Sequence, residues 1–194
     1  AGTAGAGNTV IEFAEGTYEA PADWTPIKVD GYNGADIVTL NGNGATITGL
    51  KSSLFAGGFA GGSGIVIKDL TIEDATIVAD NTQGYGAFVN CADSMDEITL
   101  INCHVKNSTV TLSVADEDNG DKAGALIGNA TVATPVKDCT AANSTVSAGR
   151  DAGQLIGAGR EANVTGCSAT NVTVTANGTA SGANINNAVI GRKL

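Results

Sequence analysis

The chain has 194 residues and a formal net charge of −10, and 42% of its residues are hydrophobic, 15% charged and 4% aromatic. The hydrophobic fraction excludes a disordered chain, the apolar runs are too short for a membrane span, and the negative charge argues against nucleic acid as a partner. Its 27 glycines, and short apolar runs separated by Gly, Asn and Asp, predict an all-β chain with many tight turns.

Residues 1–35 are expected to form a linker followed by the N-terminal cap of a solenoid. After a glycine-rich start, residues 9–20 have the pattern of a strand, a turn and another short strand. A solenoid has to cover its open end, and its first repeat is usually atypical for that reason.

All aromatic residues lie between Phe13 and Phe88. These bulky rings either plug the open end of the core or form a platform on which a sugar ring could stack. The candidates for such a ligand-binding platform are Trp24, Tyr32 and Tyr85.

Residues 36–194 carry a repeat of variable length. The stretch CHVKNSTV at 103–110 returns as LTIEDATI at 70–77, CTAANSTV at 139–146 and CSATNVTV at 167–174, with a looser copy, LNGNGATI, at 40–47. A period of roughly thirty residues that varies by a few residues is typical of a solenoid with one supersecondary unit per turn. The sequence therefore predicts a single structural domain, a right-handed parallel β-helix of about five rungs with three short strands each.

Each copy contains two further parts. One apolar residue stands three positions before the start of the copy, and an apolar pair recurs between small residues that allow close backbone approach at a corner. The last pair starts a rung without room to finish, which predicts an end-to-end contact or a following domain at the C-terminal rung. The pairs are Leu54-Phe55, Phe88-Val89, Leu126-Ile127, Leu155-Ile156 and Val189-Ile190.

Alternation within residues 103–110 predicts which side chains face the core. The alternation slips by one position at Asn107, where the other copies also carry Asn or Asp. These residues tolerate left-handed backbone conformations, so we expect a bend there and a ladder of asparagine side chains between turns. The residues assigned to the core are Cys103, Val105, Ser108 and Val110.

The pattern GALIG at 124–128, a short loop and Val136-Lys-Asp-Cys139 resembles the GLUG-type repeat, whose theme is a Gly-x-Leu-Val-Gly strand followed by an apolar residue and Asn-Cys. The resemblance implies a β-helix from a large bacterial surface protein, an adhesin or a secreted protease, outside any catalytic part, and it implies no catalytic residues. The N-terminal third is similar only in general to pectate-lyase-like β-helices. The matching residues are 86–103, 124–139 and 153–167.

Cys103, Cys139 and Cys167 share one repeat position, where an earlier copy has Leu70. Neighbouring turns bring such residues within disulfide range, but parallel side chains give poor geometry for the bond. We therefore predict a ladder of free cysteines in the core. Alternation places the only histidine, His104, on the outer surface and away from the thiols.

Acidic clusters could hold calcium, or could serve an enzyme that cleaves polysaccharides. The run DEDNGD at 116–121 has alternating oxygen ligands, although its glycine comes one place too early for an EF-hand loop. Its candidate calcium ligands are Asp116, Asp118 and Asp121, and no other cofactor is predicted. The basic candidates for a cleavage mechanism are Arg150 and Arg160.

Two outward positions beside an inward Val or Ile carry threonine in most copies. Threonine favours exposed strand surface because of its β-branch, and stacked turns would form two parallel files of hydroxyl and methyl groups. This array resembles the Thr-x-Thr surfaces of ice-binding β-helices. The outward files comprise Thr46, Thr48, Thr76, Thr109, Thr111, Thr145, Thr173 and Thr175.

These patterns favour a noncatalytic module of a bacterial secreted or cell-surface protein, acting as an adhesin-like binding module or as a stalk. Its partner would be a host or matrix surface, presenting a glycan or another protein. A pectate-lyase-like, polysaccharide-active enzyme fragment is the main alternative, and an ice-binding protein is the third.

Overall fold

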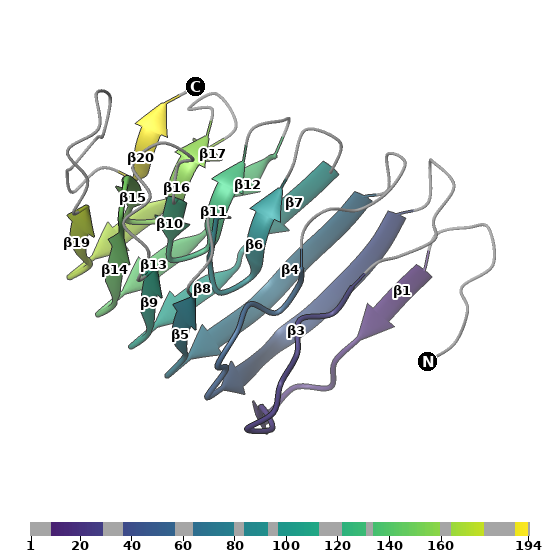
Figure 1. The fold of residues 1–194 in the computed structure, drawn as a ribbon. Helices are drawn as coiled ribbons and strands as arrows, with labels where there is room; N and C mark the ends of the chain where they lie inside the picture. The colour runs from purple at the N-terminus through teal and green to yellow at the C-terminus, as the bar shows by residue number, and fades with distance from the viewer. Residues whose placement is uncertain are drawn as a thin grey trace.

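The structure, a computed structural model, describes residues 9–28, 37–56, 64–79, 84–92, 97–112, 122–130, 134–159, 164–176 and 189–193. These ranges contain only strands, and every pairing between the named strands is parallel. The strands stack as successive turns of a solenoid (Figure 1), and two of the sheets contain four strands each, so about four complete turns form. The predicted all-β parallel solenoid is confirmed.

One wall of the solenoid is a ten-stranded sheet. Two long strands cross its full width, namely β3 (Ile37–Thr48) and β4 (Gly64–Glu73). In the other turns the same path is divided into two short strands. The first halves are β1 (Thr9–Glu12), β7 (Glu97–Ile101), β12 (Val136–Lys137) and β17 (Val164–Thr165). The second halves are β2 (Thr17–Glu19), β8 (His104–Lys106), β13 (Thr140–Ala142) and β18 (Ser168–Thr170).

Residues in the left-handed backbone conformation produce the bend between these halves. Asp69, Asn102 and Asp138 have φ angles of 54°, 51° and 54°, and Gly166 takes the same position in the last turn. A second file of left-handed residues lies at the predicted Asn107 position, which confirms the bend expected there. Asn and Asp adopt this conformation because their short polar side chains bond to local groups. The second file consists of Asp74, Asn107, Asn143 and Asn171, with φ between 51° and 54°.

Three further sheets form the rest of the solenoid, and the smallest of them spans two turns only. A complete turn has more than the predicted three strands, because the left-handed residues split the repeated stretch and a short strand precedes the apolar pair. One four-stranded sheet contains β5 (Thr76–Ala79), β9 (Thr109–Leu112), β14 (Thr145–Ala148) and β19 (Thr173–Ala176). The other contains β6 (Val89–Ala92), β11 (Ile127–Ala130), β16 (Ile156–Gly159) and β20 (Ile190–Lys193). The smallest sheet pairs β10 (Lys122–Gly124) with β15 (Asp151–Gly153).

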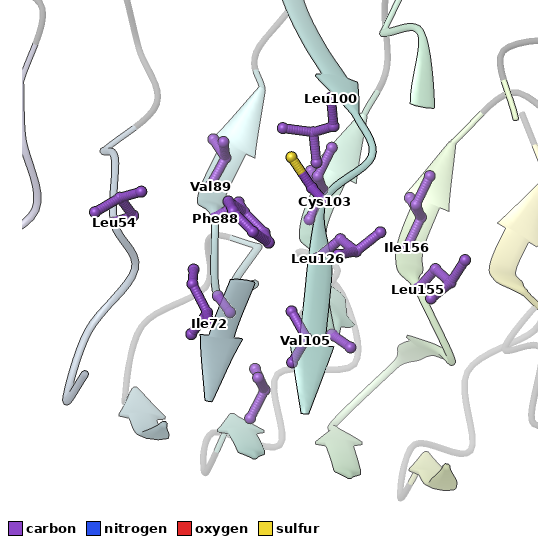
Figure 2. Packing of buried hydrophobic residues seen from close by; sticks show 14 of the residues in the cluster. Leu54, Ile72, Phe88, Val89, Leu100, Cys103, Val105, Leu126, Leu155 and Ile156 are labelled. Carbon is purple, nitrogen blue, oxygen red and sulfur yellow. The ribbon is translucent and has the colours of Figure 1, made fainter. Parts of the chain in front are cut away.

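The core is a stack of apolar side chains that follows the axis of the solenoid. All four residues assigned to the core in the 103–110 stretch are buried, which confirms the predicted alternation. Phe88, Leu126 and Leu155 of the apolar pairs are buried with them (Figure 2). The small residues beside these pairs are required by close contact, since a Cβ atom at Gly128 would collide with the backbone nitrogen of Tyr85.

Residues 9–28, which were expected to cap the solenoid, form a partial turn at the end of the stack. Strands β1 and β2 pair in register with β3, and Ile27 bridges Phe55 of the next turn. Trp24 packs against the core, and its indole N–H donates a hydrogen bond to the Ser53 carbonyl oxygen at 3.1 Å.

Candidate functional site

The candidate site is the outward surface of the sheet formed by β5, β9, β14 and β19, which we call the threonine face. Its strands pair without a break in register, so outward residues of successive turns lie side by side. All of these outward residues are exposed or half-buried. The first file contains Thr76, Thr109, Thr145 and Thr173, and the second contains Val78, Thr111, Ser147 and Thr175.

The threonine face is a regular two-dimensional array. Neighbouring strands lie about 4.8 Å apart, and alternate residues along a strand lie about 6.6 Å apart. Each threonine offers one hydrogen-bond donor, two acceptor lone pairs and a methyl group. The surface can therefore make many weak polar and apolar contacts with a flat partner.

Thr46 and Thr48 were predicted to belong to these files, and that prediction is wrong. Both residues lie in β3 and pair with β4 in the ten-stranded sheet. The register between the two strands shifts between Asn41 and Ala45, where β3 contains extra residues. The looser copy at 40–47 is therefore out of phase with the others.

A network of four hydrogen-bonded side chains lies on the outer surface of the ten-stranded sheet. The Asn102 Nδ2 donates to Asp69 Oδ1 at 2.8 Å. The imidazole of His104 lies next, with Nε2 3.0 Å from Asn102 Oδ1 and Nδ1 2.8 Å from Thr140 Oγ1. Because the amide nitrogen of Asn102 faces a carboxylate, its oxygen faces the ring. The network is satisfied when Nε2 carries the proton and Nδ1 accepts from the threonine hydroxyl.

His104 faces outward as predicted, but it is half-buried and held by neighbours instead of lying free on the surface. Burial lowers its pKa, nearby Lys106 lowers it further, and Asp69 opposes both effects. Alternation along one strand gives the direction of the side chain, whereas its partners come from residues in adjacent turns that alternation does not reveal.

Cys103, Cys139 and Cys167 form the predicted ladder of free thiols, in which Cys103 and Cys139 are buried and Cys167 is half-buried. The Cys103 N–H donates to Cys139 Sγ at 3.4 Å, and the Cys139 N–H donates to Cys167 Sγ at 3.3 Å. Contact with the Cys103 thiol, assisted by burial, raises the pKa of Cys139 to about 12. The Cys139 thiol and burial raise the pKa of Cys167 well above its ordinary value. Cys139 and Cys167 are therefore protonated at neutral pH, which suits packing and not nucleophilic chemistry.

Two inward serines have the same role at the second bend, and sequence reasoning missed it. Ser108 Oγ accepts the Ala75 N–H at 3.0 Å, and Ser144 Oγ accepts the Ser108 N–H at 3.1 Å. Sequence reasoning treated these serines only as small residues. The available signal was a Ser or Cys directly after the left-handed Asn or Asp.

The predicted asparagine ladder is present in part. Asn171 Nδ2 donates to Asn143 Oδ1 at 3.1 Å, whereas Asn107 Nδ2 donates to Glu73 Oε1 at 3.0 Å. The turn before Asn107 has Asp74 at the ladder position, and the neighbouring glutamate supplies the acceptor there.

The aromatic candidates have packing roles where the structure describes them. Trp24 and Tyr85 are partly buried against the core, and Tyr85 lies in a bridge with Ala123. Tyr32 lies outside the described residues. The rings of Trp24 and Tyr85 are therefore not fully exposed for stacking against a ligand.

The calcium candidates Asp116, Asp118 and Asp121 lie outside the described residues, so this site stays a prediction. Within the described ranges, no three His, Cys, Asp or Glu side chains are grouped so as to hold a metal ion. The same ranges contain no helix long and apolar enough to span a membrane.

Of the two basic candidates for catalysis, Arg160 lies outside the described residues. Arg150 is mostly buried, and its Nε lies 3.9 Å from a carboxylate oxygen of the fully buried Asp151. The two side chains are therefore at the outer limit of an ion-pair distance.

Comparison with known proteins adds one structural likeness. No family model and no curated protein matches the chain. A crystal structure of a "putative immunoglobulin A1 protease" from Bacteroides ovatus is similar over 93% of this chain and 74% of that chain, with a TM-score of 0.47 and 14% sequence identity.

Proposed function

We propose that the chain is a noncatalytic solenoid module of a bacterial secreted or cell-surface protein, and that it binds its partner through the threonine face. The observation that carries this proposal is the unbroken register of β5, β9, β14 and β19, which places two files of short side chains on one surface. The bacterial and surface location rests on the repeat resemblance in the sequence alone.

The core beneath the threonine face supports a binding role because it makes that face rigid. The inward residues Ile77, Val110 and Val146 are fully buried directly under the two files. Backbone hydrogen bonds join each strand to the next turn, so little conformational entropy remains to be lost when a partner binds. A rigid array of this kind also suits a stalk that holds other domains apart.

The chemistry of the face favours an extended polar partner, such as a polysaccharide or the surface of another protein. Its side chains are neutral, and they offer hydroxyl and methyl groups at repeated intervals. Each contact is weak, so affinity would come from the number of turns engaged at once.

Binding to a glycan array and to immobilised polysaccharides tests the proposal. Thr145→Lys and Thr173→Lys place a large charged side chain on exposed positions of the threonine face and should lower retention by at least about tenfold. Thr165→Lys and Thr170→Lys add the same charge on exposed positions of the ten-stranded sheet and should leave it unchanged. Equal losses from both pairs would show that the threonine face is not the binding surface.

Ice binding is a second candidate, and the in-register threonine files are the observation that favours it. Val78 and Ser147 interrupt the second file, whereas the first file is threonine throughout. Thermal hysteresis of the native chain that Thr145→Lys abolishes would support this function. Its absence would leave the partner-binding proposal in place.

A polysaccharide-active enzyme fragment is the main alternative that the sequence analysis left open. That hypothesis predicts cleavage of the same polysaccharides that the module retains. Measuring binding and bond cleavage on one panel separates the two functions.

A further inference from the structure

The apolar core is partly open at the first turn of the solenoid. Inward-facing Ile11 is 43% exposed, whereas its partner Leu40 in the next turn is 2% exposed. Tyr18 is 38% exposed, whereas its partner Ile47 is 6% exposed. The side chains at this end therefore lack the covering layer that the following turn receives.

The last turn is open in the same way. Four of its inward residues are half-buried, although the equivalent residues one turn earlier are fully buried, whereas Val172, Ala176 and Ile190 of this turn are buried. Within the described residues, β17, β18 and β19 each pair with a single neighbouring strand. Such an edge can pair with a further parallel strand. The half-buried residues are Val164, Cys167, Ala169 and Val174.

The two ends correspond to each other strand for strand. β1 and β17 occupy the same file of the ten-stranded sheet, and so do β2 and β18. If the first turn of one copy follows the last turn of another, the existing register continues. Ile11 then lies over Val164, and Tyr18 lies over Ala169, so an apolar residue covers an apolar residue at both positions.

Charge favours this order over a contact between two first turns. The first turn carries exposed Glu12, Glu15 and Glu19. Two first turns placed against each other would bring these carboxylates together, and like charges in close contact repel. In the head-to-tail order, Glu12 and Glu19 instead meet the neutral Thr165 and Thr170 of the last turn.

We propose that copies of this chain associate head to tail, with the first turn of one copy docking on the last turn of the next. The contact adds parallel strands to the edge of the solenoid and covers the open core. It is heterologous, because two different surfaces meet, so each copy keeps one free end and the assembly can grow beyond a dimer.

Sedimentation velocity from about 1 µM to about 1 mM tests the proposal, since this range covers weak to moderate self-association. The native chain should increase in mass with concentration and pass beyond the dimer. Ile11→Lys blocks the first turn, and Ala169→Lys blocks the last turn, where the long side chain can reach solvent at the open end. Each variant alone should associate at least about tenfold more weakly.

An equimolar mixture of these two variants gives the sharpest result, because each retains the surface that the other has lost. The mixture should form dimers and stop there. Lys106→Glu and Lys137→Glu change the charge on exposed outward positions of inner turns, away from both ends, and should associate like the native chain. Val174→Lys replaces Ala169→Lys if circular dichroism shows that the latter is unfolded.

A native chain that stays monomeric over the whole concentration range would overturn the proposal. Growth that stops at the dimer would also overturn it, because a dimer joined head to tail still has one unused first turn and one unused last turn that can bind further copies. Association of Ile11→Lys alone with native strength would show that the first turn is not part of the interface.

Discussion

At the residue scale, a cysteine or serine that directly follows a left-handed residue completes the hydrogen bonding of the backbone at that bend. Cys139 Sγ accepts an N–H from the preceding turn and lies 3.2 Å from the Lys137 carbonyl oxygen. Ser108 Oγ accepts the Ala75 N–H and donates to the Lys106 carbonyl oxygen at 2.7 Å. The thiol and the hydroxyl therefore have the same role, because each accepts a hydrogen bond from a buried backbone N–H that has no partner in a neighbouring strand.

Removing the hydroxyl at one of these bends should destabilise the folded protein. Ser108→Ala leaves the Ala75 N–H buried without its acceptor and should lower the free energy of unfolding by about 1–3 kcal/mol. Ser108→Cys should recover part of this loss, because cysteine has the equivalent role at the other bend. Urea denaturation measures the effect, with outward Ser147→Ala as the control. If Ser108→Ala and Ser147→Ala behave alike, the corner hydrogen bond contributes nothing.

The cysteines should react slowly in the folded protein. Cys139 and Cys167 have raised pKa values, so the stability that they contribute is present below the ordinary value of 9.0 and is lost as pH rises through the folded values. Because Cys103 is fully buried and the thiols of Cys139 and Cys167 stay protonated, thiol titration at neutral pH should show slow labelling of all three and full labelling in denaturant without reductant. Labelling that remains low in denaturant would indicate disulfides and contradict the ladder.

His104 should make stability depend on mildly acidic pH. Its pKa is lowered in the folded state, so the unfolded chain binds more protons. Its contribution is present above the ordinary value of 6.5 and is lost as pH falls through the folded value. His104→Thr installs the residue found in the adjacent turns and should reduce the loss of stability between about pH 8 and pH 5. Identical pH profiles for the two proteins would show that His104 does not titrate differently on folding.

At the element scale, the structure of the repeated stretch could be predicted wherever the residues of that stretch alone determine it. Alternation identified the inward residues Cys103, Val105, Ser108 and Val110, and the recurrent Asn identified the second bend. The first bend was harder to predict, because Gly166 replaces Asn or Asp in one of its turns. The alignment of residues 40–47 with the other copies depends on how β3 pairs with β4, and the sequence of one strand does not reveal that pairing.

Opposite faces of one strand should respond differently to the same substitution. Val110→Asp places a carboxylate in the buried stack and should cost at least about 3 kcal/mol of stability, whereas the neighbouring Thr109→Asp should cost less than about 1 kcal/mol. Val110 is 1% exposed, and Thr109 lies on the threonine face. Denaturant melts compare the two variants directly. Equal losses would mean that the inward and outward assignments are wrong.

At the scale of the whole molecule, each turn contacts mainly its neighbours, so the solenoid is held by repeated local interfaces. The candidate site follows from this arrangement, because stacking converts a short Thr-x-Thr pattern into a surface across β5, β9, β14 and β19. The sequence predicted the files but placed Thr46 and Thr48 in them. The His104 network required three-dimensional neighbours from three turns, and sequence spacing alone could not reveal it.

The most direct test is to measure retention and cleavage together on one panel of pectin, alginate and glycosaminoglycans, with and without calcium. A noncatalytic binding module should produce no new reducing ends and no unsaturated products, whatever it retains. Asp116→Ala serves as the matched variant, because Asp116 is a calcium candidate that a cleavage mechanism would need. Turnover by the native chain that this variant abolishes would contradict the proposed function and would establish the chain as a polysaccharide-active enzyme.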